Sequence, residues 1–216
     1  MNILCVKVGN KYDFEYVNRL YYNTRQYFPQ SKFYCITENS EGISPEVSII
    51  PLPPDNLEKW WWKMWLFNPE WMRLDDCLYL DLDLVLQDKF EVLYDKYPTI
   101  LYNYWNSPDW LETQKHKRYS YCDLNTSVIS WNRNTDRKSI WHDFNRDREI
   151  ILFIFRGIDN WICSQKKKVN FYPDIAGSYN EGGWTDHPVV LFNWNGQTDQ
   201  DTKPHEVGWK STTKVK

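Results

Sequence analysis

The pattern of apolar and polar positions along the chain predicts an α/β domain. Near the N-terminus a β-rich run ends at Gly9-Asn10, and apolar side chains then recur at helical spacing behind Asp13. Two more β-rich runs follow, and prolines close the second of them. This β-α-β-β opening favours a sheet whose strands are joined by helical crossovers. The expected elements are a strand at 3–8, a helix at 14–28, and strands at 33–37 and 47–52.

The rest of the chain continues the alternation of strands and helices. The strongest strand signal is the run 77–86, and the segment 58–67 is a helical candidate dense in tryptophan. We find no internal repeat and no linker, so a single domain over 1–216 is expected, with a polar, irregular segment at 195–216. The other expected elements are a polar excursion at 106–119, strands at 99–104, 125–131, 169–172 and 189–194, and helices at 137–155 and 158–165.

Composition narrows the class of protein. Of the 216 residues, 42% are hydrophobic, as in an ordinary folded domain, but the aromatic share is 18%, with 13 Trp and 15 Tyr. This excess predicts that some rings line a binding surface, because flat rings pack well on bases and sugars. The net charge is −3, with acids and bases mixed along the chain, which argues against a nucleic-acid partner.

Neither a membrane span nor a secretory context is expected. The longest apolar run, 150–155, is far too short to cross a bilayer, and the N-terminus lacks the architecture of a signal peptide. The five cysteines are widely spaced and form no C-x-x-C pair, a pattern typical of reduced thiols. We therefore expect a soluble cytoplasmic protein, in a bacterial, viral or host cytosol.

The most informative segment is Tyr79-Leu80-Asp81-Leu82-Asp83-Leu84-Val85-Leu86. In a strand, Asp81 and Asp83 would point the same way, about 6–7 Å apart, and their unpaired burial would cost several kcal/mol. A divalent cation would remove that cost, and carboxylate oxygens suit Mg²⁺ or Mn²⁺. From spacing alone the alternative stays open that nearby Arg, Lys or helix N-termini satisfy both carboxylates. The end of a strand in an α/β sheet is also where ligands usually bind.

Four stretches of the chain, taken in order, resemble glycosyltransferase family 8 and its viral and bacterial relatives. They span nearly the whole chain, and the D-x-D pair and the Lys-Pro step match most closely. The stretches are Cys5 to Tyr12, Tyr79 to Leu86, Leu124 to Ile129, and Asn193 to His205. The resemblance implies a GT-A (Rossmann-like) α/β domain, in which helices flank a mostly parallel mixed sheet.

The resemblance also implies the roles of individual residues. Asp81 and Asp83 would hold Mn²⁺ or Mg²⁺ against the two phosphates of a UDP-sugar, and Lys203 would contact the diphosphate as a point charge. The family's third metal ligand, a His, is absent, so Asn193 or Asn195 replaces it or the coordination is completed differently. The other implied donor contacts are Tyr12 on uracil, the backbones of Val8 and Gly9, Lys63 near the donor, and Asn125 facing the donor sugar.

Asp159 is the catalytic candidate. The sequence Ile158-Asp159-Asn160-Trp161 is similar to the family's acidic D-Q pair near the transferred sugar. If the reaction inverts the configuration of the sugar, Asp159 would be the general base that deprotonates the acceptor; if the reaction retains it, no strong nucleophile is obvious. The same residue follows a glycine and opens an apolar helical segment, so an N-cap role is the alternative.

Three functions follow from these observations. The first is a metal-dependent glycosyltransferase that moves a hexose-type sugar from a UDP-sugar to an acceptor hydroxyl, on a glycan or a protein-linked glycan. The second is a metal-dependent phosphohydrolase or nuclease, which would need further carboxylates or histidines close to the D-x-D pair. The third is a carbohydrate-binding module, which would hold sugar with its aromatic rings and ignore nucleotides.

Overall fold

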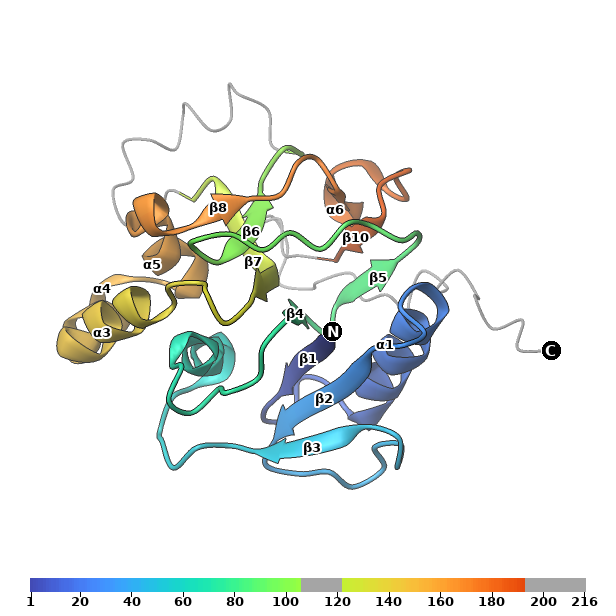
Figure 1. Ribbon diagram of the computed structural model, residues 1–216, viewed down its shortest axis with the longest axis horizontal. Coiled ribbons are helices and arrows are strands. Elements are labelled where there is room, and N and C mark those ends of the chain that lie inside the picture. Colours follow the sequence, from blue (N-terminus) through green and yellow to red (C-terminus); the bar gives the residue numbers. More distant parts are fainter. Residues whose placement is uncertain (106–121, 193–216) are drawn as a thin grey trace.

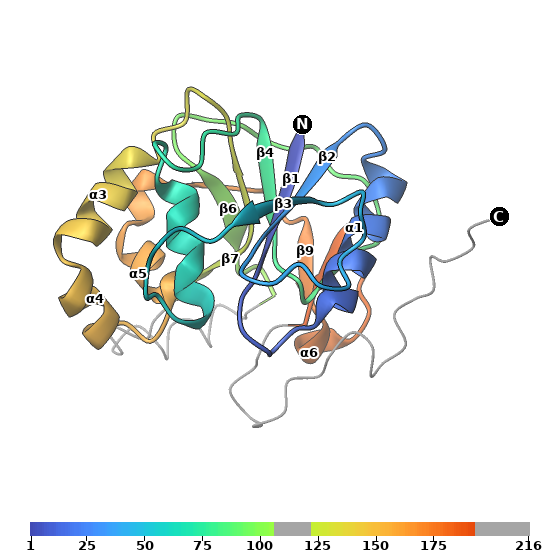
Figure 2. The ribbon, with the colours of Figure 1, turned by 90° about the horizontal axis from the view of Figure 1, so that it is seen from below.

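The computed structural model describes residues 1–105 and 122–192, which form three layers, a central sheet with helices on both faces. Figure 2 shows α1 (Phe14–Tyr27) on one side of the sheet. On the other side lie the 3-10 helix η1 (Lys59–Phe67), which contacts both α3 and α5, and the helices α3 (Lys138–Arg146), α4 (Arg148–Ile154) and α5 (Ile158–Ser164). The expected α/β architecture is confirmed.

The central sheet has seven strands in the order β3-β2-β1-β4-β7-β6-β8 (Figure 1). Four of the neighbouring pairs are parallel, whereas β7 is antiparallel to both β4 and β6. The sheet is therefore mostly parallel and mixed. Its strands are β1 (Asn2–Lys7), β2 (Lys32–Thr37), β3 (Ser48–Pro51), β4 (Cys77–Leu80), β6 (Thr99–Tyr102), β7 (Leu124–Trp131) and β8 (Asn170–Phe171).

A second sheet of three strands has the order β5-β10-β9. The central strand of this sheet, β10, is antiparallel to β5 and parallel to β9. The chain leaves the central sheet at the end of β4 and enters the second sheet at β5, so these two sheets are joined through the segment 81–83. The remaining elements are β5 (Leu84–Leu86), β9 (Ala176–Ser178), β10 (Val189–Leu191), the short helix α6 (Tyr179–Gly182) and the 3-10 turn η2 (Lys166–Lys168).

Alternating side chains of the buried strands fill a core on each face of the central sheet. From β1, Ile3 and Cys5 join a core that includes Val17 of α1, while Leu4 joins the core that includes Trp61 of η1. Because both faces are covered, the strands read as nearly continuous apolar runs rather than as an alternation of apolar and polar positions. The pleat of β4 follows the same rule, and it directs Tyr79 to the η1 side of the sheet.

The predicted continuous strand at 77–86 is wrong in its middle. β4 ends at Leu80 and β5 begins at Leu84, and a turn lies between them. Aspartate is disfavoured in strands, and Leu82, at 2% exposure, anchors the turn in the core. Asp81 and Asp83 are therefore not alternate positions of one strand, and the argument that they share a strand face fails.

Two other expectations differ from the structure in detail. The helix predicted at 137–155 is broken at Asp147, which separates α3 from α4. The strand β9 and the helix α6 were not predicted, because elements of three and four residues are too short to show a period. The other predicted strands and helices of the described residues are confirmed, with ends that shift by a few residues.

Candidate functional site

Polar side chains gather at one edge of the central sheet. β1 and β4 are parallel neighbours, so their carboxyl ends lie at the same edge. β7 runs the other way, and the N–H of Asp81 donates to the carbonyl of Ser127 at 2.9 Å, so the start of β7 lies at this edge too. The loops after β1 and β4 and the first residues of β7 therefore surround a single site, at the end of the sheet where α/β proteins bind ligands.

The carboxylate of Asp81 accepts hydrogen bonds from three side chains. Lys63 Nζ lies 3.2 and 3.0 Å from its two oxygens, and the Ser127 hydroxyl donates to Oδ2 at 2.9 Å. The Tyr79 hydroxyl donates to Oδ1. The side chains of Lys63 and Asp81 are only 8% and 21% exposed. For Asp81, therefore, a nearby lysine does neutralise the carboxylate, as the alternative interpretation of the sequence allowed.

Lys63 is a buried cation that the fold brings to the acidic residues. It lies inside η1, and the end of that helix is held by Arg137, which donates to the carbonyls of Leu66 and Met72. Burial acts to lower the pKa of Lys63, but the charges of three neighbouring carboxylates outweigh it and raise the pKa above its ordinary value. Lys63 is therefore positively charged at neutral pH. The three carboxylates belong to Asp81, Asp159 and Asp83.

Asp83 lies beside this cluster and has a different partner. The Tyr12 hydroxyl donates to its Oδ2 at 2.6 Å, and the N–H of Phe192, at the end of β10, donates to its backbone carbonyl at 3.0 Å. Burial, and secondly the charge of Asp81, raise the pKa of Asp83 from 3.8 to about 6, against the opposing effects of Tyr12, Lys11 and Lys63. The ionised form of Asp83 is thus disfavoured in the folded protein.

This shift predicts how an Asp83→Asn variant affects stability without metal. A carboxyl group whose pKa is raised on folding stabilises the protein in its protonated form, and this stability is lost as the pH rises from about 4 through about 6. At pH 7.5, in chelator, we expect Asp83→Asn to increase the free energy of unfolding by about 1–2 kcal/mol, less than the full linkage value because the side chain is partly exposed.

Urea titrations of the variant and the wild type at pH 7.5 and at pH 4 test this expectation. The gain should vanish at pH 4, where the wild-type carboxyl is protonated. Asp186→Asn, on the exposed loop before β10, is the control for replacing an aspartate at the surface. A destabilised Asp83→Asn at pH 7.5 would contradict the raised pKa.

Asp159 joins the site from α5. Its Oδ1 accepts the backbone N–H of Thr126 at 3.1 Å and also the Thr126 hydroxyl. Burial raises the pKa of Asp159, and Lys63 and the Thr126 hydrogen bonds oppose that rise. The N-cap of α5 is Gly157, so the alternative N-cap role of Asp159 is wrong. Asp159, the second residue of α5, instead connects this helix to β7 through its hydrogen bonds with Thr126.

Several implied donor contacts lie around this cluster. Tyr12 is half-buried and packs against Tyr16, and Val8 and Gly9 directly follow β1. The N–H of Gly9, at a φ of 67°, donates to the Glu38 carboxylate at 2.7 Å. Asn125 is 8% exposed, and its Oδ1 accepts the N–H of Ser127 at 2.8 Å. The implied roles of Asn193, Asn195 and Lys203 fall on positions outside the described residues.

Sequence reasoning missed the hydroxyl donors of the site. Tyr79 and Ser127 donate to Asp81, and Thr126 donates to Asp159. No sequence pattern links Thr126 or Ser127 to these acids. For Tyr79 one signal was present, since it lies two positions before Asp81 in the run that was expected to be a strand, where such positions share a face. Part of the aromatic excess fills the core instead of a binding surface, since Trp61 and Trp62 are buried at 7% and 8% exposure.

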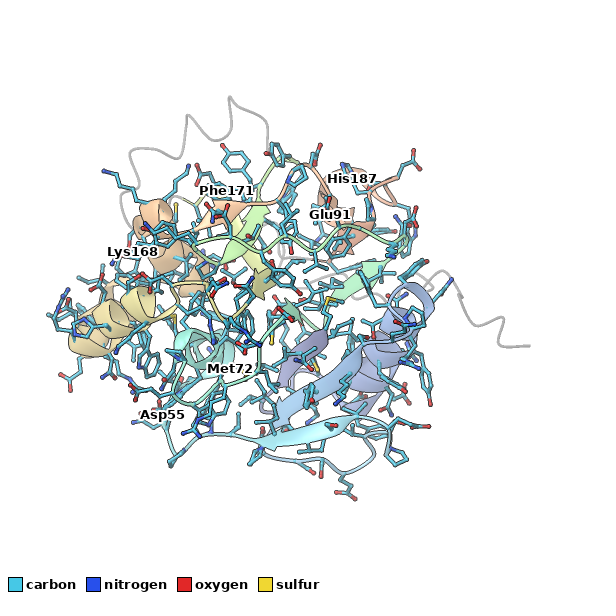
Figure 3. The ribbon with its side chains drawn as sticks, viewed as in Figure 1. Asp55, Met72, Glu91, Lys168, Phe171 and His187 are labelled. Carbon is cyan, nitrogen blue, oxygen red and sulfur yellow. The ribbon has the colours of Figure 1, made fainter. Side chains whose placement is uncertain are left out.

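The half-buried imidazole of His187 is also engaged within the fold. Figure 3 labels this residue at the upper right. Its Nε2 is 3.2 Å from Asp174 Oδ1 and its Nδ1 is 3.0 Å from the Thr185 hydroxyl, while its carbonyl accepts the Gln87 side-chain amide. These contacts hold the ring of His187 in place.

The carboxylate oxygens of this site fit a hard divalent cation. Asp81 and Asp83 supply carboxylate oxygens, and the raised pKa of Asp83 marks a negative charge that its surroundings do not fully compensate. No group of three or more His, Cys, Asp or Glu side chains suited to a metal occurs within residues 1–105 and 122–192.

Comparison with known proteins identifies the fold. No protein-family model matches the chain, and no curated protein matches its sequence. The galactosyltransferase LgtC, solved in complex with donor and acceptor sugar analogues, is 13% identical over 90% of this chain and 88% of its own, with a TM-score of 0.63. An active-site mutant of LgtC is 14% identical over 94% and 89%, with a TM-score of 0.64.

A third solved structure is the apo form of the glycosyltransferase GlyE from Streptococcus pneumoniae TIGR4. It is 12% identical, with a TM-score of 0.65, over 96% of this chain but 58% of GlyE. At such identities the likeness concerns the fold, which is that of the GT-A glycosyltransferases. The expected GT-A fold is thereby confirmed. Within the described residues, no helix is both long and apolar enough to cross a bilayer.

Proposed function

We propose that the chain is a glycosyltransferase that moves a hexose-type sugar from a UDP-sugar to an acceptor hydroxyl on a glycan or protein-linked glycan, with Mn²⁺ or Mg²⁺ bound by Asp81 and Asp83. One observation carries the proposal. An incompletely neutralised carboxylate, Asp83, lies beside a neutralised one, Asp81, at the ligand-binding edge of a GT-A sheet. Two neighbouring carboxylates repel an anion that arrives alone. They favour a divalent cation, which can bind the carboxylates and a diphosphate together.

Each residue has a distinct role in this proposal. Asp83 is the principal metal ligand, because the oxygens of Asp81 already accept four hydrogen bonds from Lys63, Tyr79 and Ser127. Asn193 completes the protein ligands in this proposal, which is supported by its position in the sequence directly after Phe192, whose N–H is bound to the Asp83 carbonyl. When bound, the cation offsets the charge that builds on the leaving diphosphate.

The other groups bind and orient the substrates. Tyr12 stacks on uracil, the backbones of Val8 and Gly9 contact the base, Lys63 and Asn125 contact the donor, and Lys203 contacts the diphosphate. Gly9 N–H already donates to Glu38, so the carbonyl of Gly9 is better suited to the base than its N–H group. Asp159 has a raised pKa and lies beside Lys63, so it is the candidate to accept the proton of the acceptor hydroxyl in an inverting reaction.

Calorimetric titration of UDP, GDP and CMP, each with Mn²⁺ and with chelator, tests the proposal. We expect UDP to bind at least about tenfold more tightly with Mn²⁺, since one charge-assisted contact contributes about 1.5–3 kcal/mol. Equal binding of UDP in chelator and in Mn²⁺ would sink it. Hydrolysis of a phosphodiester without a sugar donor would identify a nuclease, and glycan binding that ignores nucleotides would identify a carbohydrate-binding module.

A further inference from the structure

Helix α4 presents an apolar side to solvent. Ile150 is 61% exposed, Phe153 91% and Ile154 37%, and these positions, spaced by three and four residues, share one side of the helix. Ile151 alone is buried among the residues of α4. A surface helix of a globular protein normally turns charged side chains outward, so this arrangement is the reverse of the usual one.

One more side chain extends this surface from a neighbouring element. Trp60, at the start of η1, is 45% exposed. It lies against Gly157, where an added Cβ would come within 2.9 Å of its indole nitrogen. Gly157 follows Ile154 by three residues, so Trp60 lies where α4 ends and α5 begins. We name the apolar surface of Trp60, Ile150, Phe153 and Ile154 the α4 face.

The size of the α4 face decides which partner could cover it. With fully exposed aromatic side chains contributing about 150–250 Å² each, these four leave on the order of 500 Å² of apolar surface in water. A two-fold contact between two copies would bury about twice that, on the order of 1,000 Å², which is where specific interfaces begin. One large, protruding ring, that of Phe153, has the character of an interface anchor.

The charges beside the face favour a second copy over a membrane. Arg146 pairs with Asp147 at 2.6 Å and with Asp143 at 3.3 Å, and Arg148 pairs with Asp55, at the lower left of Figure 3. The two arginines around the start of α4 are thus matched by aspartates, whereas binding to anionic lipid relies on a surplus of Lys and Arg. A surface that carries both positive and negative side chains can pair with a copy of itself. Across a two-fold axis, a positive residue of one copy can meet a negative residue of the other, and the reverse.

From this area and this charge balance we propose that the α4 face is the interface of a symmetric dimer of this chain. The inference does not depend on the proposed function. Because η1 carries Lys63 and α5 carries Asp159, the contact would also cover the starts of the two helices that deliver these residues to the site.

Sedimentation velocity across the micromolar range tests the dimer, with wild type beside Phe153→Gln. We expect a concentration-dependent dimer whose dissociation constant rises at least about 100-fold in the variant, since two-fold symmetry removes the ring twice. Tyr22→Gln is the control. It replaces a 55% exposed aromatic residue on α1, across the central sheet from α4 (Figure 2), and should leave the dimer intact.

Melting curves establish that both variants are folded, as expected for such exposed positions. A wild type that stays monomeric up to the highest concentration overturns the proposal, as does a dimer that Phe153→Gln does not weaken. Flotation with vesicles of phosphatidylcholine and phosphatidylglycerol completes the test. Vesicle binding by a monomeric wild type, lost in Phe153→Gln, would assign the face to a membrane instead and equally overturn the dimer.

Discussion

The variant Asp83→Asn should lose metal-dependent binding of UDP and nearly all sugar transfer. Asparagine keeps the size of the side chain and an acceptor for the Tyr12 hydroxyl, but it removes the charge that a divalent cation needs. Bound cations contribute several kcal/mol to stabilising the charge of such a transition state, and each 1.36 kcal/mol is a factor of ten. We therefore expect the transfer rate to fall about a thousandfold or more.

The measurement is a transfer or donor-hydrolysis assay beside UDP calorimetry, both in Mn²⁺. The variant has an internal control, because the same substitution is expected to stabilise the metal-free protein at pH 7.5. Lost activity together with raised stability separates the loss of a ligand from misfolding. If Asp83→Asn keeps a Mn²⁺ dependence close to that of the wild type, Asp83 is not the principal ligand.

The variant Lys63→Met should be the most destabilising substitution in the site. It removes the buried ammonium that lies about equally close to both Asp81 oxygens, and leaves the charges of Asp81, Asp159 and Asp83 facing one another. Breaking a buried ion pair from one side costs about 3–5 kcal/mol, since the remaining charge is uncompensated. We expect a loss of that size at pH 7.5, measured from urea unfolding transitions.

Two further measurements isolate the electrostatic cause. The double variant Lys63→Met with Asp81→Asn should regain most of the lost stability, because the carboxylate closest to the missing ammonium is then neutral. The deficit of Lys63→Met should also shrink as the pH falls towards 4, because the carboxyl groups of the cluster take up protons when their cation is missing. A loss below about 1 kcal/mol at pH 7.5 would show that Lys63 is not the counter-ion of this cluster.

The elements with local signals were predictable from the sequence. Asp13 accepts the N–H of Glu15 as the N-cap of α1, and the apolar spacing behind it follows the helix. The buried strand that leads into the D-x-D segment was correctly identified. The turn inside this segment was not, because apolar and polar residues alternate through 80–84 as they would in a strand. The alternation reports only which way side chains point. The change from one sheet to the other depends on backbone pairing, since β4 pairs with β1 and β7 whereas β5 pairs with β10.

The contacts inside the site could not be predicted, because they depend on non-local pairing. The Lys63–Asp81 pair requires η1 to pack over the end of β4, and the bond from Ser127 to Asp81 requires the antiparallel register of β4 and β7. A one-residue slip in that register would turn Ser127 to the other face. The resemblance supplied candidates such as Lys63 and Asn125, but neither their partners nor the structural contacts of Asp159.

The passage of the chain from β4 to β5 has a consequence for the order of folding. β5 pairs with β10, where Val85 lies opposite Val190. The partner strand of β5 is therefore synthesised only after the roughly hundred residues that separate the two strands. Closing such a long loop is slow, because the chain loses conformational entropy before the contacts between the two strands can stabilise it. During synthesis, the core around β1, β2 and β3 has its partners early, whereas the carbonyl of Asp83 must wait for Phe192. The acidic turn thus closes late, after the part of the central sheet formed by β1, β2 and β3.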